Sequence, residues 1–210
     1  MRVLIVGGLG NMGRRYAAIL NAMNIDFNIY DSRVPRRLED VAVGCDRAII
    51  ATPTDTHFDS LIEVIDMING PILCEKPVCK DIDQLKTILR IAEEKQRHIR
   101  MVMQYKYVFR NPIPGRDSHY DFYHHGNDGL YWDCMQIIGL ATGKIVLKED
   151  SHTWKCSLNG EFPSMNENTM NLAYFGNIFD WINHPELCVG PEEILSIHEK
   201  VLKYAADQES

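Results

Sequence analysis

The sequence predicts an α/β fold, in which a doubly wound parallel sheet is followed by a small α+β domain with a mainly antiparallel sheet. Residues 2–6 are a short run of aliphatic and β-branched residues, which is typical of a strand buried on both faces. This run leads directly into a glycine-rich loop, after which short apolar runs alternate with segments of helical periodicity. Strands that alternate with helices in this way indicate parallel strands joined by crossover helices.

The glycine-rich loop carries Gly8, Gly10 and Gly13 at the spacing G-x-G-x-x-G. After it, apolar residues recur at helical spacing, residues 27–30 form a second strand-like run, and Asp31 follows about twenty residues beyond the glycines. The order of strand, glycine loop, helix, strand and acidic residue is that of a Rossmann dinucleotide-binding unit. The sequence therefore predicts a dinucleotide site in this stretch.

Each part of this unit has a physical role in the prediction. We expect Gly8 to allow the tight turn out of the first strand, and Gly10 to let the backbone approach a pyrophosphate because no Cβ intervenes. Gly13 would let the helix pack closely on the sheet. Asn11 and Met12 stand at the start of that helix, where unpaired N–H groups and the positive end of the helix dipole favour phosphate.

The acidic residue bears on the choice of cofactor. Asp31 would accept hydrogen bonds from the hydroxyls of the adenosine ribose, which favours NAD over NADP. The loop that follows holds Arg33 and Arg36, either of which could meet the 2′-phosphate of NADP, so NADP stays possible. The alternative interpretation of both arginines is that they are solvated charges of a polar loop.

Further strands and helices follow in the N-terminal half of the chain. The apolar residues at 47–51 and 72–74 predict two more buried strands. Apolar residues at helical spacing predict one helix across 61–68 and another across 85–92, the second capped by Asp81. Together with the first two strands, these elements complete the predicted parallel sheet.

We place the domain boundary near residue 100. Residues 1–100 form the predicted dinucleotide-binding Rossmann domain, and residues 101–210 form a truncated α+β domain for substrate binding and dimerisation. Between residues 101 and 158, the second stretch contains one candidate helix and several candidate strands. The helix spans 128–141, and the strands span 101–108, 120–124, 144–148 and 153–158.

Composition and charge argue against several classes of protein. The net charge of −7 disfavours nucleic acid or anionic membrane as the main partner, and no apolar run reaches the length of a membrane span. Six cysteines without a C-x-x-C pair, and an N-terminus that begins with a strand, predict a cytoplasmic protein with reduced thiols. His124 and His125 would point to opposite faces of a strand, so no metal site is predicted.

Three segments together resemble a known family. They are the glycine loop, residues 51–53 (Ala-Thr-Pro) with His57 after them, and residues 75–77 (Glu-Lys-Pro). At these separations they are similar to the Gfo/Idh/MocA family of NAD(P)-dependent oxidoreductases, and the resemblance runs through about residue 112. It implies an enzyme that transfers a hydride to or from a hydroxyl or carbonyl carbon of a sugar, cyclitol or sugar derivative.

The resemblance also implies roles for single residues. In the family, the lysine of the Glu-Lys-Pro segment sits by the nicotinamide and the reacting hydroxyl, so Lys76 would be the main acid/base. Glu75 is carried over as a contact of the nicotinamide ribose, and Thr52, Pro53 and His57 as further cofactor-binding residues. Independently of the family, Lys76 follows a parallel strand, and open α/β sheets place their ligands at the carboxyl ends of strands.

In the second half, the family carries a helix with Asp-x-x-x-His whose acid and histidine face the substrate. Asp133 matches the acid, and we expect it to orient the substrate or relay a proton. Ile137 stands at the position of the histidine, so Gln136 becomes the candidate for a hydrogen bond to the substrate. Relatives carry a larger second domain, which implies that the C-terminal domain is shortened here.

Two other functions stay open at this point. The missing histidine and the shortened domain also fit a non-catalytic sensor or assembly protein that binds a dinucleotide without turnover. A third hypothesis is an enzyme that uses the Rossmann half for a non-redox nucleotide. Relatives dimerise through the open face of their sheet, and a small sheet would otherwise expose an apolar face, so we expect a homodimer or a higher homo-oligomer.

Overall fold

The chain divides into two compact units, each of which is built from two separate stretches of sequence. The first unit comprises Met1–Val102 and Ile178–Leu195, and the second comprises Met103–Asn177 and Ser196–Ser210. The structure is a computed structural model. It describes residues 1–108, 120–124, 130–140, 145–149, 156–158 and 167–209.

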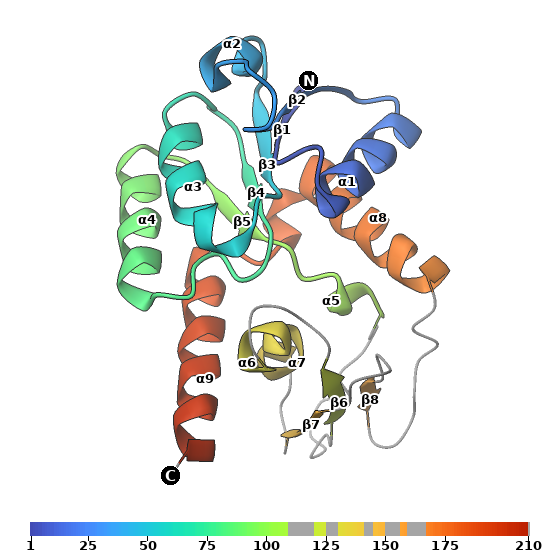
Figure 1. The fold of residues 1–210 in the computed structure, drawn as a ribbon, viewed down its shortest axis with the longest axis vertical. Coiled ribbons are helices and arrows are strands. Elements are labelled where there is room, and N and C mark those ends of the chain that lie inside the picture. The colour runs from blue at the N-terminus through green and yellow to red at the C-terminus, as the bar shows by residue number, and fades with distance from the viewer. Residues whose placement is uncertain (109–119, 125–129, 141–144, 150–155, 159–166, 210) are drawn as a thin grey trace. The chain divides into compact units, whose positions relative to one another are not determined.

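The first unit is built on a five-stranded sheet with the order β2-β1-β3-β4-β5, and all of its pairings are parallel (Figure 1). This arrangement confirms the predicted doubly wound sheet. The strands are β1 (Arg2–Val6), β2 (Asp26–Tyr30), β3 (Arg47–Ile50), β4 (Ile72–Cys74) and β5 (Ile99–Met101).

Helices cover both faces of this sheet. In Figure 1, α1 lies on one face, and α3 and α4 lie together on the other. The predicted cap of α4 is confirmed, since the Asp81 carboxylate accepts hydrogen bonds from the backbone N–H groups of Asp83 at 2.8 Å and Gln84 at 2.9 Å. The helical elements are α1 (Asn11–Ala22), α2 (Leu38–Ala42), η1 (Thr54–Thr56), α3 (His57–Ile65) and α4 (Ile82–Glu94).

The core of the first unit lies in the central strands. Residues 3–5 of β1, 48–50 of β3 and 72–74 of β4 are all 0% exposed. Such continuous burial is expected where helices cover both faces of a parallel sheet. Burying each leucine or isoleucine of these strands contributes about 1.5–3 kcal/mol, so this core holds the strand ends firmly in register.

A segment from the C-terminal part of the chain also belongs to the first unit. It runs from the end of α8 (Glu167–Asn183) through η2 (Pro185–Leu187) to the start of α9 (Pro191–Glu209). Helical periodicity does not show which unit a helix packs on. The boundary that we drew near residue 100 from the sequence therefore left this C-terminal segment out of the first unit.

Specific contacts hold the returning segment. Trp181 is fully buried, and Arg47 Nη1 donates a hydrogen bond to the Trp181 carbonyl at 2.7 Å. The Arg47 Cζ also lies 5.6 Å from the centroid of the Trp181 ring. Val189 forms an antiparallel bridge with Met101, the last residue of β5. The edge of the parallel sheet is therefore completed by residues that lie far away in the sequence.

The second unit contains a three-stranded sheet with the order β7-β6-β8. Its strands are β6 (Tyr120–His124), β7 (Ile145–Glu149) and β8 (Cys156–Leu158). β6 pairs with β7 in parallel and with β8 antiparallel, so the described sheet is mixed, whereas we expected a mainly antiparallel one. Alternation along a strand predicts that it is a strand but does not give the direction of its neighbours.

The helices of the second unit differ in part from the prediction. The single strand predicted across 101–108 is wrong, because β5 ends at Met101 and Tyr105–Val108 is the short helix α5. A short apolar run does not distinguish a strand from a turn that leads into a helix. The helix predicted across 128–141 is divided into α6 (Leu130–Asp133) and α7 (Met135–Leu140), and its outermost residues lie outside the described ones.

Among the helices that the structure describes, none combines the length and the apolar character needed to cross a membrane.

Candidate active site

The carboxyl ends of the strands of the first unit lie side by side at one edge of the sheet. The parallel register pairs Val6 of β1 with Tyr30 of β2 and Ile50 of β3, and it pairs Ile50 with Cys74 of β4. The residues that follow each strand therefore meet at this edge. They are the glycine loop (residues 7–13), Asp31, residues 51–53 and residues 75–77.

Close contacts explain why the loop needs glycine. Gly7 has φ +82°, and a Cβ there would lie 2.7 Å from the Ala51 oxygen. A Cβ on Gly13 would lie 2.4 Å from the Gly7 oxygen and 2.5 Å from the Gly8 Cα. The tight turn is thus at Gly7, whereas we predicted it at Gly8. Gly8 instead leaves room for Ile29, whose Cγ2 would be 2.4 Å from a Cβ at this position.

Gly10 has a different role from the other glycines of the loop. It is the N-cap of α1, with φ −74°, and a Cβ there would meet the Gly7 oxygen at 3.3 Å and the Ala51 oxygen at 4.0 Å. No side chain caps α1 by a hydrogen bond. Its first turn begins with Asn11 and Met12 and holds no acidic residue. A helix start that is left uncapped in this way suits an anion such as a pyrophosphate.

Asp31 is held firmly at the end of β2. Its side chain is 5% exposed, and its Oδ2 accepts a hydrogen bond from the Leu9 N–H at 3.0 Å. The Arg33 guanidinium donates to Oδ1 at 2.7 Å and to Oδ2 at 2.8 Å. The hydrogen bond from Arg33 holds the pKa of Asp31 well below its usual range, although burial opposes this. Asp31 is therefore a fixed carboxylate beside the glycine loop.

The segment 75–77 is fixed from the side of α1. Tyr16 is fully buried and donates its hydroxyl hydrogen to Glu75 Oε1, and Glu75 is 7% exposed. The second carboxylate oxygen of Glu75 accepts a hydrogen bond from the Lys76 N–H at 3.1 Å. The helix that follows the glycine loop is thereby linked to the backbone of Lys76.

His57 fixes the same segment from the side of α3. It is 1% exposed; its Nδ1 lies 2.8 Å from the Pro77 carbonyl oxygen and its Nε2 lies 2.9 Å from the Thr52 carbonyl oxygen. The Lys76–Pro77 peptide bond is cis. Because both ring nitrogens contact protein carbonyls, we expect His57 to position the residues that meet a cofactor rather than to bind it directly.

Lys76 itself is half-buried at the carboxyl end of β4, between the two residues that are fixed in this way. Three residues of this arrangement were not predicted as site residues. Gly7 has a signal, the Gly-Gly doublet at the strand end, whereas Tyr16 has none, since its partner Glu75 lies 59 residues away. Arg33 was interpreted as a contact for a phosphate or as a solvated charge, and not as the partner of Asp31.

Asp133 and Gln136, the other predicted catalytic residues, belong to the second unit. Asp133 is the last residue of α6, and its side chain lies outside the described part. Gln136 is 2% exposed, and its Oε1 accepts a hydrogen bond from the Tyr105 N–H at 3.0 Å. Ile137 is fully buried. The structure therefore gives Gln136 a packing role, and its contact with a substrate stays a prediction.

Within the described residues, no group of three or more His, Cys, Asp or Glu side chains could hold a metal ion. The side chain of His124 and the whole of His125 lie outside the described part.

Comparison with known proteins identifies the first unit. A family model for the oxidoreductase family with an NAD-binding Rossmann fold, GFO_IDH_MocA, matches residues 1–103. Residues 1–103 belong to the Gfo/Idh/MocA family. This confirms the resemblance seen in the sequence, and it makes this half an NAD-binding Rossmann domain. The Gfo/Idh/MocA half contains the glycine loop, Asp31 and the Glu-Lys-Pro segment described above.

A curated relative of this Gfo/Idh/MocA half is the inositol 2-dehydrogenase of Rhizobium meliloti (strain 1021). It is 36% identical over 55 residues, which are 26% of this chain and 16% of that protein. The match thus spans about a sixth of the relative, so the activity of the whole relative does not transfer with it.

Solved structures show the same fold. A protein from Sinorhizobium meliloti 1021 assigned as a myo-inositol dehydrogenase has a TM-score of 0.79 at 12% identity, covering 99% of this chain and 98% of that one. The UDP-N-acetylglucosamine 3-dehydrogenase GnnA from Acidithiobacillus ferrooxidans has a TM-score of 0.75 at 12% identity, covering 97% of this chain and 96% of that one. The WlbA dehydrogenase from Thermus thermophilus, in complex with NAD and UDP-GlcNAcA, has a TM-score of 0.67 at 10% identity, covering 96% of this chain and 93% of that one.

Proposed function

We propose that this protein is an NAD(P)-dependent oxidoreductase that transfers a hydride to or from a hydroxyl or carbonyl carbon of a sugar, cyclitol or sugar derivative. The observation that carries this proposal is the meeting of the glycine loop, Asp31 and the Glu-Lys-Pro segment at the carboxyl edge of one parallel sheet. The substrate class rests on the similarity to inositol and UDP-sugar dehydrogenases.

The residues at this edge fit a dinucleotide. The uncapped start of α1 behind Gly10 would hold the pyrophosphate, and Asp31 would hold the adenosine ribose. Thr52 and Pro53 follow β3, and Glu75 follows β4, the next strands along the edge, and we place the nicotinamide end there. The adjacent order of these strands supports one extended site across the edge.

When bound, the nicotinamide supplies or accepts the hydride. Lys76 would exchange a proton between its Nζ and the oxygen of the reacting carbon. The chain prepares Lys76 for this role by fixing both of its neighbours: Glu75 is held by the Tyr16 hydroxyl, and Pro77 is held by the His57 ring. The role of Asp133 as an orienting or proton-relay carboxylate stays a prediction from the sequence.

The link from Tyr16 leads to a prediction about stability and positioning. Tyr16→Phe removes one hydrogen bond from the buried Glu75 carboxylate, so the free energy of unfolding should fall by about 1–3 kcal/mol. Because the Lys76 backbone is bonded to the same carboxylate, kcat should fall as well, with a smaller change in the KM for NADH. Denaturant unfolding and steady-state kinetics measure the two effects. Tyr30→Phe, at a partly exposed tyrosine, is the control and should leave both unchanged.

A second candidate function is a dinucleotide-binding sensor or assembly protein without turnover. Two observations in the second unit favour it: the residue at the position of the family histidine, Ile137, is fully buried, and Gln136 is engaged with the backbone of Tyr105. An aliphatic side chain cannot move a proton, so turnover would rest on Lys76 and Asp133. A homodimer stays a prediction under either function.

Titration of NADH into the purified chain, followed by hydride exchange, separates these functions. We expect NADH to bind with a Kd between about 1 μM and 1 mM, the range usual for enzyme ligands. Deuteride transfer from labelled NADH to the carbonyl carbon of one of a panel of ketoses, keto-inositols and keto forms of UDP-sugars would support the enzyme. Binding without transfer to any of them would favour the sensor, and no binding would overturn both.

A further inference from the structure

A groove of about 940 Å³ lies beside β5, the edge strand of the parallel sheet. One wall is formed by α4 and the turn into β5, and the other by the returning segment from η2 to the start of α9. All of its lining residues belong to the first unit. The glycine loop follows β1, and β3 and β4 lie between β1 and β5, so this groove is separate from the proposed dinucleotide site.

Arg100 lines this groove from the middle of β5. Its neighbours Ile99 and Met101 are both 0% exposed, and a charged side chain in such a place usually has a partner. The Nε of Arg100 is buried, and no acceptor meets it within the described part of the chain. Buried polar atoms are almost always hydrogen-bonded, so this N–H group indicates a place for an acceptor from outside the chain.

The other arginines of the groove already have partners. Arg90 forms an ion pair with Glu94 at 2.5 Å, and Arg97 Nη2 donates a hydrogen bond to Asn69 Oδ1 at 2.7 Å. The remaining basic residues of the lining are exposed to water, namely Lys86 and His98. Arg100 is therefore the basic residue of this groove that best suits a bound anion.

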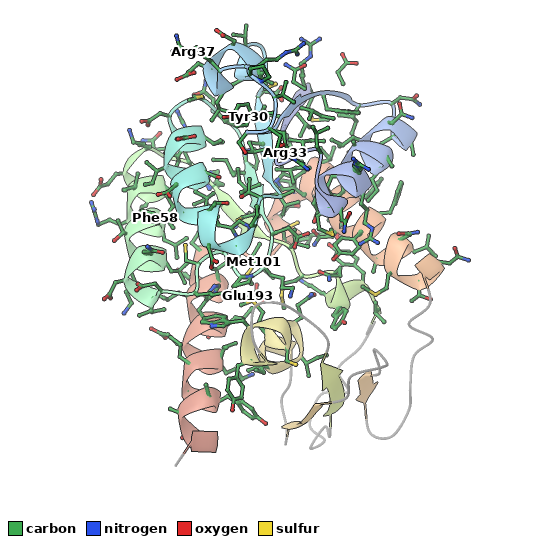
Figure 2. The ribbon with its side chains drawn as sticks, in the orientation of Figure 1. Tyr30, Arg33, Arg37, Phe58, Met101 and Glu193 are labelled. Carbon is green, nitrogen blue, oxygen red and sulfur yellow. The ribbon has the colours of Figure 1, made fainter. Side chains whose placement is uncertain are left out.

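Gly190 gives the Arg100 guanidinium a defined place. A Cβ on Gly190 would lie 2.3 Å from Arg100 Nη1 and 3.5 Å from its Cζ, so a larger residue would displace the guanidinium. In Figure 2, Glu193 in the first turn of α9 lies close to Met101 of β5, in agreement with the bridge between Met101 and Val189. The guanidinium thus lies between β5 and the residues that lead into α9.

The other residues of the lining decide which anion fits. A guanidinium has planar donors that match a carboxylate or a phosphate. Glu192 and Glu193 line the same groove, and within the described residues neither forms an ion pair with Arg100. They would repel a phosphate more than a carboxylate, because phosphate carries more negative charge at neutral pH. Apolar residues of both walls could contact an apolar body, namely Leu89, Ala92, Cys188, Pro191 and Leu195.

We propose that this groove binds a small organic monocarboxylate, with its carboxylate on the Arg100 guanidinium and its apolar body against the apolar residues of the two walls. The carboxylate would accept a hydrogen bond from the buried Nε. A ligand here would contact both α4 and the returning segment, and it should therefore stabilise the first unit. This inference does not rest on the proposed function, because none of its residues belongs to the dinucleotide site.

The test is a titration of butyrate, hexanoate and octanoate into the full chain, followed by ligand-observed NMR, with inorganic phosphate for comparison. The affinity should rise by about twofold to fourfold for each added methylene, and phosphate should bind more weakly than hexanoate. Arg100→Met keeps an aliphatic chain but removes the guanidinium, so the affinity for hexanoate should fall by about tenfold or more. Arg37→Ala is the matched control: it removes an exposed arginine that pairs with Glu39 at 3.3 Å, and it should leave the affinity unchanged.

Several outcomes would overturn this proposal: no binding of any carboxylate to wild type, tighter binding of phosphate than of hexanoate, or wild-type affinity in Arg100→Met. If Arg100→Met does not fold, Gly190→Ala decides, since it displaces the guanidinium and should weaken hexanoate binding by about threefold or more. Saturating NADH should leave the Kd for hexanoate unchanged, whereas competition would place the carboxylate in the dinucleotide site and contradict the proposal. If NADH does not bind, the proposed function fails and the carboxylate titration still tests the groove.

Discussion

Replacing Lys76 with alanine is expected to lower kcat by about 100-fold to 10,000-fold, the usual contribution of a general acid or base, while the Kd for NADH changes by less than about threefold. Lys76 follows Glu75 at the carboxyl end of β4, and its backbone N–H is bonded to the Glu75 carboxylate at 3.1 Å. The variant keeps this backbone and loses only the amine. The cofactor contacts proposed for Gly10, at the start of α1, and for Asp31, after β2, are separate from this segment and stay intact.

Two further variants make this experiment specific to proton transfer. Lys76→Arg keeps a positive charge but cannot give up its proton near neutral pH, so it should be almost as slow as Lys76→Ala. Lys80→Ala removes a nearby lysine that pairs with Asp55 at 3.3 Å, and it should retain wild-type turnover. Steady-state rates of NADH formation measure all three. A Lys76→Ala enzyme as fast as wild type would contradict the assignment of Lys76.

The parts of this site that could be predicted from sequence are those whose signal is local. The glycine spacing, Asp31 and the Glu-Lys-Pro segment each stand within a few residues of a strand end, where burial and backbone geometry restrict the residue type. The parallel register then brings them together, as expected for strands joined by crossover helices.

Two of the contacts that could not be predicted join residues far apart in the chain. Tyr16 bonds to Glu75 over 59 residues, and Arg47 bonds to Trp181 over 134, and no periodicity records either pair. The Arg33–Asp31 pair is local, but a flexible side chain in a polar loop gives no pattern that separates pairing from solvation. The apolar run that includes Met101 indicates burial but not whether the chain turns, so the strand predicted there was too long.

Replacing Gly10 with alanine is expected to raise the Kd for NADH by about tenfold or more, since the added methyl group stands where the backbone must approach the pyrophosphate. The fold should tolerate this change. Gly10 has φ −74°, which alanine adopts freely, and the new Cβ would make one tight contact, 3.3 Å from the Gly7 oxygen, which a small shift of the loop relieves. The free energy of unfolding should therefore change by less than about 1 kcal/mol.

Gly13→Ala provides the contrast that gives this prediction its meaning. Its Cβ would lie 2.4 Å from the Gly7 oxygen, so the helix must move, and stability should fall by about 1–3 kcal/mol together with NADH binding. Denaturant unfolding and NADH titration give the free energy of unfolding and the Kd for NADH of each variant. If Gly10→Ala binds NADH as well as wild type while folding normally, the pyrophosphate does not rest at the start of α1. We expect Gly10→Ala to lose NADH binding while its stability is unchanged, and Gly13→Ala to lose both NADH binding and stability. That difference would show that Gly10 contacts the ligand, whereas Gly13 is needed for packing within the loop.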